Sequence, residues 1–511
     1  MLQDGKICIG KGEQNVFMYP SMLNRHGLIA GATGTGKTTT LKVLAEDLSL
    51  LGVPVFLADI KGDLGGMAVP GTMSDKLQDR LTGMGIDHVD FQSFPVHFFD
   101  VYGEKGHPIR TTVSEMGPLL LGRILGLSDV QEDVLNLIFR IADDNNLLLV
   151  DIKDLRAMIE YVSNHVKDYT ANYGAMSKQS LGAIQRNLLS LDDQGGNIFF
   201  GEPALDLRDW MERDIDGKGY INILHCERLF QSPILYSTFM LWMMSELYEM
   251  MPEAGDCDKP KIAFFFDEAH LLFRDAPRVL LDKIEQMVKL IRSKGVAVFF
   301  ITQAPTDIPA PVLAQLSNRI QHALRAYTPA EQKVLKSTAE SFRANPKFNT
   351  MEVLTSLGVG EALISVLDEK GIPTVVERAK IVCPASQMGA IDDGLRNSII
   401  QKSDLYGKYE KGVDNQSAYE VLSEKAQNEK DKIEAEEQAV KEAKERAIQE
   451  KELEKLNKQA AKEAEKQRKE EEKQKAKSMK YVNKVTNSAL SAVGREVGRK
   501  VARGLFGSFK W

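Results

Sequence analysis

A glycine-rich segment near the start of the chain has the composition of a phosphate-binding loop. Residues 31–38 are GATGTGKT, placed between a short apolar run and a helix-forming one. Glycines let the backbone wrap an anion so that successive N–H groups point at it. Lys37 is expected to contact the β- and γ-phosphates of ATP, and the Thr38 hydroxyl to ligate Mg²⁺. The predicted nucleotide-binding residues are Gly31, Ala32, Thr33, Gly34, Thr35, Gly36, Lys37, Thr38 and Thr39.

A second segment, KIAFFFDEAH at 261–270, places two carboxylates at the end of an apolar strand. Asp267 is expected to hold Mg²⁺, through water, and Glu268 to orient and polarise the attacking water as a general base. Kinases that share the phosphate loop lack such a glutamate, because attack by free water would waste ATP. The pair therefore predicts an ATPase whose hydrolysis drives motion.

Two further strand ends carry polar residues. Gln303 follows the apolar run 296–301, where a polar residue commonly senses the γ-phosphate in ring ATPases. Asp59 begins the segment DIKGD, at another strand end. Such ends face the ligand crevice of an α/β sheet. Asp59 could assist the water or the magnesium ion, or it could cap the loop.

Apolar runs of strand length alternate with helical patterns from residue 1 to about 400, which predicts an α/β fold on a mostly parallel sheet. With the phosphate loop at 31–38, this is predicted to be a P-loop ATPase core. Between 111 and 190 the strand pattern gives way to helical spacing. We expect core parts at 1–110 and 191–400 around a helical insertion. The predicted strands are 28–30, 53–59, 96–99, 220–224, 262–267, 296–301 and 362–367.

The segment 401–480 is predicted to be a long charged helical arm. It is rich in Glu, Lys, Gln and Ala, and no Gly or Pro occurs between Gly412 and Gly494. These are strong helix formers with many i,i+4 Glu–Lys pairs. A weak heptad at Ala426, Ile433, Val440 and Ala447 fades, so a solvated single helix or partly disordered arm is favoured over a coiled coil.

The last segment, 481–511, is predicted to be a basic amphipathic helix. From Lys480 onward seven basic residues stand against one acid, Glu496, and apolar residues recur at spacings of three and four. Three roles remain open: docking onto the assembly or a partner protein, binding an anionic membrane surface, and binding nucleic acid.

Composition is that of a soluble globular protein. Of the 511 residues, 43% are hydrophobic and 27% charged, and the net charge of −7 gives no sign of a basic nucleic-acid binder. The four cysteines lie far apart, as in a reduced cytoplasmic protein without disulfides or a zinc site. The chain begins without a signal-peptide pattern, and its apolar runs fall short of the roughly 20 residues of a membrane helix. We expect a cytoplasmic protein.

Together these motifs resemble the HerA–FtsK superfamily of ring-forming motor ATPases, and within it the bacterial HerA-like helicase branch. The resemblance spans nearly the whole chain. Besides the loop and the Asp-Glu-Ala-His box, it includes RHG at 25–27, VSEMGP at 113–118, FGEPA at 200–204, ITQ at 301–303, PTVVER at 373–378, and Gly494, Gly498 and Gly504.

The resemblance implies a RecA-like (HerA-like) fold for the P-loop core and a homohexameric ring with ATP bound between subunits. Such rings need an arginine from the neighbouring subunit to stabilise charge on the transferring phosphate. Arg292 matches the family's trans arginine, with Arg319 and Arg325 as alternatives, and Arg25 matches a family arginine near the loop.

The chain also departs from related proteins. HerA itself carries an N-terminal β-barrel, whereas about 27 residues precede the first core strand here, which argues against nuclease docking through such a barrel. The Asp-Glu-Ala-His box also occurs in superfamily 2 helicases, but their arginine-rich Gln-x-x-Gly-Arg motif is absent from this sequence.

Three functions fit the sequence: a helicase-like ring motor that translocates DNA, a motor that acts on protein or at a membrane surface, and a nucleotide-switched scaffold. A basic strip on channel-facing loops would favour DNA, since phosphate neutralisation dominates DNA affinity. The sequence shows no such Lys/Arg cluster before residue 400.

Overall fold

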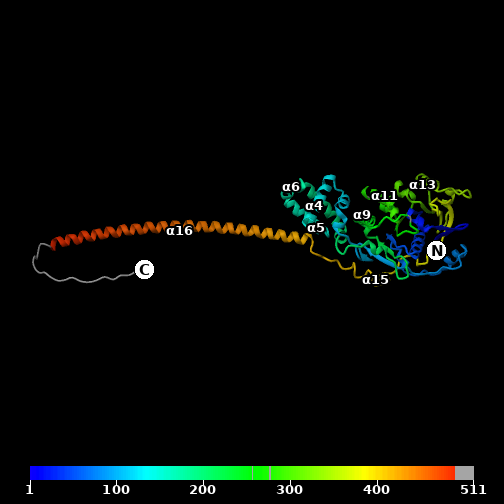
Figure 1. Ribbon diagram of the computed structural model, residues 1–511, viewed down its shortest axis with the longest axis horizontal. Coiled ribbons are helices and arrows are strands. Elements are labelled where there is room, and N and C mark those ends of the chain that lie inside the picture. The colour runs from blue at the N-terminus through cyan, green and yellow to red at the C-terminus, as the bar shows by residue number, and fades with distance from the viewer. Residues whose placement is uncertain (256, 275–277, 490–511) are drawn as a thin grey trace. The chain divides into compact units, whose positions relative to one another are not determined.

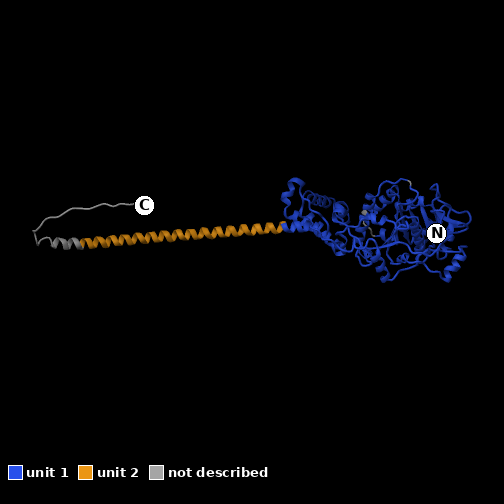
Figure 2. Cartoon of the chain, turned by 60° about the horizontal axis from the view of Figure 1, so that its bottom comes forward, with its two compact units in different colours: residues 1–424 blue, residues 425–511 orange. Residues whose placement is uncertain are grey.

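The computed structural model describes residues 1–255, 257–274 and 278–489. The chain divides into two compact units, 1–424 and 425–511 (Figure 2). Residues 490–511, which make up most of the predicted basic helix, lie outside the described residues.

The described strands form one thirteen-stranded sheet with a parallel centre, in the order β1-β2-β13-β12-β11-β4-β10-β9-β5-β8-β6-β7, and β3 pairs with β2. All residues of β4, β5, β9 and β10 are buried, as expected of parallel strands covered on both faces. The parallel strands are β4 (Gly27–Ala30), β5 (Val55–Asp59), β6 (Val96–Asp100), β7 (His107–Pro108), β8 (Ile221–His225), β9 (Ile262–Phe266), β10 (Val296–Thr302) and β11 (Asn318–His322). This confirms the predicted fold class, and six of the seven predicted strands lie in this set.

The remaining strands extend one side of the sheet in antiparallel fashion. β11 pairs with β12 (Glu361–Ser365), which is the seventh predicted strand, and β12 pairs with β13 (Glu377–Ile381). β13 then pairs with β2 (Lys6–Lys11), which also pairs with β1 (Leu2–Gln3) and β3 (Asn15–Met18). The first residues of the chain therefore extend the same sheet.

Two hydrophobic clusters cover the two faces of the sheet. Because side chains alternate along a strand, Phe264 and Phe266 of β9 belong to one cluster and Phe265 to the other. The first cluster includes α9 (Pro233–Met250) and α11 (Arg278–Leu290), and the second includes α1 (Lys37–Leu50). Figure 1 shows α9 and α11 on one side of the strands and α15 on the other.

Between β7 and β8 the chain is mostly helical, and α4, α5 and α6 lie together away from the sheet (Figure 1). The helices here are α3 (Val113–Ile124), α4 (Asp129–Asp144), α5 (Ile152–Asn164), α6 (Val166–Tyr173), α7 (Lys178–Leu191) and α8 (Asn197–Phe199). Elsewhere lie α2 (Asp75–Thr82), α10 (His270–Phe273), α12 (Ala310–Leu313), α13 (Pro329–Glu340), α14 (Thr350–Ser356), α15 (Asp393–Lys402) and α16 (Ala418–Ala489).

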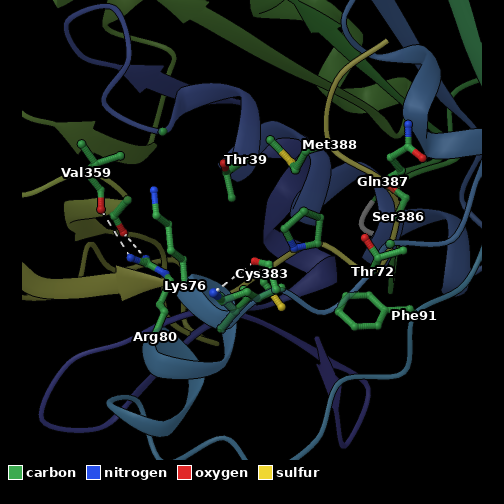
Figure 3. A pocket seen from close by; sticks show the side chains of 17 residues that line it. Thr39, Thr72, Lys76, Arg80, Phe91, Val359, Cys383, Ser386, Gln387 and Met388 are labelled. Carbon is green, nitrogen blue, oxygen red and sulfur yellow. Dashed lines mark hydrogen bonds between the residues drawn. The ribbon is translucent and has the colours of Figure 1, made fainter. Parts of the chain in front are cut away.

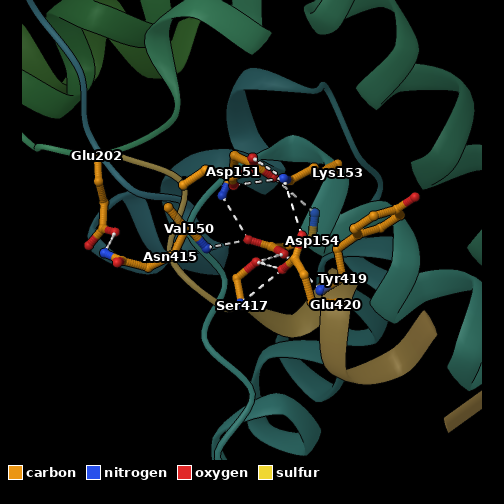
Figure 4. A network of polar contacts seen from close by, with 10 residues as sticks. Val150, Asp151, Lys153, Asp154, Glu202, Asn415, Ser417, Tyr419 and Glu420 are labelled. Atoms are coloured by element: carbon orange, nitrogen blue, oxygen red, sulfur yellow. Dashed lines mark hydrogen bonds and ion pairs between the residues drawn. The ribbon is translucent and has the colours of Figure 1, made fainter. Parts of the chain in front are cut away.

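The start of α16 is bound to α5 through one buried carboxylate, that of Asp154 (Figure 4). Its Oδ1 accepts hydrogen bonds from Ser417 Oγ at 2.6 Å and from the Tyr419 amide at 2.8 Å. Its Oδ2 accepts from the amides of Val150 at 2.8 Å and Asp151 at 3.1 Å. The same side chain therefore caps the first turns of two helices that are far apart in sequence.

Beyond its first turns α16 is a solvated helix. At 1.5 Å per residue its 72 residues extend about 108 Å. The large apolar side chains are exposed, and their intervals of seven, eight, five and three residues do not keep to one face; they are Ile433, Val440, Ile448, Leu453 and Leu456. This pattern favours the single-helix alternative over a coiled coil. Within the described ranges, no helix combines the length and the apolar character that crossing a membrane requires.

Candidate nucleotide site

The glycine-rich loop lies at the carboxyl end of β4 and leads directly into α1. It is held from both sides, because the Gly31 amide donates to Thr302 O at 3.2 Å and the Ala32 amide to Ala323 O at 2.9 Å. Lys37 is buried, and its ammonium donates to two carbonyls of its own loop, Gly31 O at 2.6 Å and Ala32 O at 3.2 Å. Burial lowers the pKa of Lys37. An anionic ligand would compensate this charge.

Two glycines of the loop have no room for a side chain. Gly36 precedes α1 with φ +112°, and a Cβ there would lie 3.1 Å from Gly360 Cα. A Cβ on Gly31 would lie 2.5 Å from His322 Cβ. The loop therefore rests directly on the last residue of β11 and on the residue before β12, which explains why glycine is needed at these positions.

Two buried histidines support this part of the sheet. His322 lies under the loop, with Nε2 2.8 Å from Thr40 Oγ1 and Nδ1 2.9 Å from Glu361 O. His26, just before β4, accepts from the Val298 amide at 3.1 Å through Nδ1, and its Nε2 lies 2.8 Å from Val288 O. Burial lowers the pKa of each from 6.5 to about 4, so both are neutral near pH 7.

These histidines predict a loss of stability in mild acid. The unfolded chain takes up protons below pH 6.5 and the folded chain only near pH 4, so their contribution is complete above 6.5 and is lost as pH falls toward 4. At pH 5 the free energy of unfolding is expected to be lower than at pH 7 by about 2 kcal/mol for each histidine. Urea unfolding at pH 7 and pH 5 measures it. The glutamine in His322→Gln cannot titrate. Between pH 7 and pH 5 the free energy of unfolding of this variant should therefore fall by about 2 kcal/mol less than that of the parent. An equal loss in both proteins would contradict the assignment.

The acidic pair lies at the same edge of the sheet. Asp267 and Glu268 follow β9, which is separated from β4 by β10 alone. Glu268 is buried and has φ +47°, a left-handed conformation that costs a non-glycine residue roughly 1 kcal/mol or more. The next amide, of Ala269, donates to Ile301 O at 2.7 Å and ties this corner to β10. Strain of this kind is concentrated at functional sites.

Lys61, at the end of the neighbouring strand β5, forms an ion pair with Glu268 Oε1. On the other side, His270 Nδ1 lies 3.3 Å from Glu268 Oε2. Burial raises the pKa of Glu268, but the hydrogen bond and charge of Lys61 outweigh burial and lower this pKa overall. Burial raises the pKa of Asp267 to about 6, while Lys61 opposes the rise. Near neutral pH Glu268 is therefore ionised and able to accept a proton.

The donor set at this edge fits a magnesium ion. Asp267 and Thr38 offer a carboxylate and a hydroxyl, the hard oxygen donors that Mg²⁺ prefers. The raised pKa of Asp267 shows that its negative charge is poorly compensated, so a cation would stabilise it. Among the described residues no group of three or more His, Cys, Asp or Glu side chains forms a metal cage. A magnesium ion here would therefore take its other ligands from phosphates and water.

The structure supports the capping role among the two considered for Asp59, and its role toward the water or the magnesium ion stays a prediction. This buried carboxylate accepts from the Gly62 amide at 2.7 Å and the Leu64 amide at 3.1 Å, so it caps the loop after β5. Burial raises its pKa to about 6. Gln303 follows β10 at the phosphate-loop edge, where its side chain is exposed. Its sensor role stays a prediction.

The arginines considered for a trans role lie at different edges of the sheet. Arg292 is exposed and precedes β10, so the length of that strand, about 20 Å, separates it from the phosphate-loop edge of its own subunit. The Arg319 guanidinium donates to Leu316 O at 3.2 Å and to Leu313 O at 3.4 Å, a structural arrangement. Arg325 is exposed just after β11, on the loop side.

Beside the start of α1 is a cavity of about 490 Å³, within the range of small-molecule sites (Figure 3). Gly36 and Thr39 form its α1 side. The other walls come from α2 and the residues preceding it, from the chain between α2 and β6, from the turn before β12, and from the segment after β13. They include Thr72, Lys76, Arg80, Phe91, Val359, Cys383, Ser386, Gln387 and Met388. Phosphates on the loop would direct the rest of a nucleotide into this space.

Sequence reasoning missed Lys61 and the cavity walls. Lys61 belongs to the segment DIKGD and follows a predicted strand end by two residues. That position is the signal that could have indicated a place beside the acidic pair. The wall residues give no comparable signal, since they meet only when β12 and β13 join the sheet.

Comparisons with known proteins agree with this geometry. The family described as "Helicase HerA-like C-terminal" matches residues 5–511. The DNA double-strand break repair helicase HerA of Sulfolobus acidocaldarius is 20% identical over 393 residues, 73% of this chain and 68% of that protein. The probable helicase MJ1565 of Methanocaldococcus jannaschii is 25% identical over 350 residues, 67% of this chain and 60% of that protein. The structure of the bacterial conjugative coupling protein TrwBdeltaN70 aligns with TM-score 0.50 at 15% identity, over 75% of this chain and 90% of that one.

The parallel sheet, the phosphate loop after β4 and the acidic pair after β9 define the class of protein, a P-loop ATPase. The chain belongs to the HerA-like helicase family, and it is an ATP-hydrolysing enzyme.

Proposed function

We propose that the chain is the subunit of a cytoplasmic homohexameric ring motor that hydrolyses ATP with Mg²⁺ and translocates on DNA. Membership in the HerA-like family supports this role, as does similarity to a protein described as a DNA double-strand break repair helicase. The observation that carries the ring is the separation of Arg292 from the phosphate loop by the length of β10. An arginine so placed cannot reach the phosphate loop of its own subunit, so a role in hydrolysis would be at the site of a neighbouring subunit.

In the proposed reaction, Lys37 exchanges its two loop carbonyls for the β- and γ-phosphates of ATP, while α1 directs its N-terminal amides at them. Bound Mg²⁺ would neutralise charge on the phosphates, held by Thr38 and Asp267. The γ-phosphate competes with Glu268 for the ammonium of Lys61. Glu268 then accepts the proton of the attacking water. Gln303, at the same edge, senses the γ-phosphate.

Arg292→Ala is expected to bind ATP normally but to lose hydrolysis as a homo-oligomer, because the arginine stabilises the transferring phosphate of the neighbour, an effect of about 10³-fold or more. Mixing it with Glu268→Gln subunits should restore part of the ATPase activity, since some interfaces then combine an intact Arg292 with an intact Glu268. The ATPase rate across mixing ratios measures this. If activity did not recover at any ratio, Arg292 would not be the arginine that acts on the neighbouring site. That role would then belong to Arg325 or Arg319, or to no arginine.

ATPase rates with duplex DNA, single-stranded DNA and anionic liposomes, at stated salt, test the proposed function. Stimulation by DNA that weakens with salt is the expected result. Stimulation by liposomes alone would favour the alternative, a motor at a membrane or on protein that is anchored through the basic residues of 481–511. A slow rate insensitive to all three would indicate a nucleotide-switched scaffold. Light scattering on the full chain checks the hexamer.

A further inference from the structure

Three residues of α1 share one face. Thr39, Lys42 and Glu46 follow at intervals of three and four, and this spacing aligns side chains along a helix. Thr39 contacts the cavity beside the phosphate loop. Lys42 and Glu46, although charged, are 0% and 3% exposed. The segment 383–388, which forms one wall of the cavity, lies along this face.

The two buried charges hold that wall by its backbone. Glu46 accepts from the Ala385 amide at 2.6 Å, from the Ser386 amide at 3.3 Å, and from the Ser386 hydroxyl. The ammonium of Lys42 donates to Gln387 O. Burial lowers the pKa of Lys42 to about 8 and raises the pKa of Glu46, although the two charges oppose these shifts. Both charges are thus kept in the interior at a desolvation cost.

The opposite side of the wall is bound to the chain that follows β5. The Gln387 amide donates to Val69 O at 2.9 Å, and the Gly71 amide donates to Ala385 O at 2.9 Å. A Cβ on Gly66 would lie 2.3 Å from Gln387 O, so the two backbones are in close contact. The wall is therefore fixed between α1 and the segment 66–71, with the side chain of Met388, half of it exposed, at the cavity.

Two charges buried against backbone groups are a poor source of stability, because removing them from water costs free energy that apolar residues of the same volume would not cost. The placement of Lys42 and Glu46 on the helix that begins at the phosphate loop indicates another role. We propose that Lys42 and Glu46 are positioning residues for nucleoside recognition: they hold the segment 383–388 so that the cavity takes the base and ribose of the nucleotide bound at Gly31–Thr38. This inference rests on the proposed ATP site and assigns to it a wall that discriminates nucleotide from bare phosphate.

The experiment compares two ligands, ATP and inorganic tripolyphosphate, which shares the phosphates but has no base or ribose. Equilibrium binding of each is measured on the full chain and on Glu46→Gln, Lys42→Met and Met388→Ala. Met388→Ala changes a half-exposed side chain and should fold even if the buried variants do not. Asp209→Asn is the matched control, since Asp209 is also a buried carboxylate that accepts hydrogen bonds, in its case from Lys408 and Tyr409, but it lies outside the cavity.

We expect Glu46→Gln and Lys42→Met to weaken ATP binding by about 10-fold to 100-fold, the loss associated with a hydrogen bond to a charged group. Tripolyphosphate binding should change less than about twofold, and the steady-state effect should fall on KM more than on kcat. Met388→Ala should show the same selectivity with a smaller loss. The inference would be overturned if the affinities for ATP and for tripolyphosphate fell by the same factor. It would also be overturned if all three variants bound ATP as tightly as the parent. A parent chain that binds neither ligand would instead overturn the proposed ATP site.

Discussion

Lys37→Ala is expected to reduce ATP hydrolysis by at least about 10²–10³-fold, the effect of removing one preorganised charge from a transition state. The ammonium lies against the phosphate loop, bound to Gly31 O and Ala32 O. Lys61, at the same edge, is bound to Glu268 and not to the loop carbonyls, so it does not occupy the place of Lys37. ATP binding by calorimetry and steady-state hydrolysis measure the effect.

The fold should survive this substitution. Lys37 lies outside the hydrophobic clusters, and burial lowers its pKa, so removing the charge relieves a desolvation cost. The melting temperature is therefore expected to stay close to that of the parent. Lys259→Met is the matched control, because Lys259 donates to Leu51 O at 2.5 Å near the opposite end of α1. Parent-like hydrolysis in Lys37→Ala would show that the site is assigned wrongly.

Glu268→Gln is expected to bind ATP and to hydrolyse it about 10²–10⁴-fold more slowly, since an amide cannot accept the proton of the attacking water. The substitution keeps the size of the buried side chain at a residue whose backbone is left-handed, so the turn after β9 should be preserved. It also removes the ion pair with Lys61, which leaves that ammonium available to the phosphates. The ATP-bound assembly should therefore accumulate.

Single-turnover hydrolysis and filter binding with labelled ATP separate binding from chemistry for this variant. His270→Gln serves as a comparison, because His270 lies 3.3 Å from the same carboxylate without replacing it as a base, and its effect should be much smaller. Loss of ATP binding together with normal turnover of the remaining nucleotide would contradict the role of Glu268 as the base.

Much of the site could be predicted from the sequence because its determinants are local. The residues of the phosphate loop are consecutive, and the loop needs only a strand before it and a helix after it. Asp267 and Glu268 follow five apolar residues, a run typical of a strand that is buried on both faces. The same reasoning located the parallel strands. The roles of these residues in binding and hydrolysis remain predictions, to be tested as above.

Contacts between distant segments could not be predicted in this way. Lys61 and Glu268 are 207 residues apart, and Lys42 and Gln387 are 345 apart, so no spacing in the chain signals either contact. The distance of Arg292 from its own phosphate loop depends on the direction of β10 in the sheet. The short antiparallel strands β1, β2 and β3 gain stability from partners elsewhere, here β13, and so they lack a strong local pattern.

The sequence by itself determined that this chain carries a phosphate-loop segment between a strand and a helix and a carboxylate pair after an apolar strand, because hydrogen-bonding geometry and hydrophobic burial act over a few consecutive residues. Only the tertiary structure decided what surrounds them. It set Lys61 against Glu268, placed Arg292 at the opposite edge, and enclosed the cavity between α1 and the segment 383–388. These arrangements depend on the pairing and order of strands, which the chain settles only when its distant parts meet.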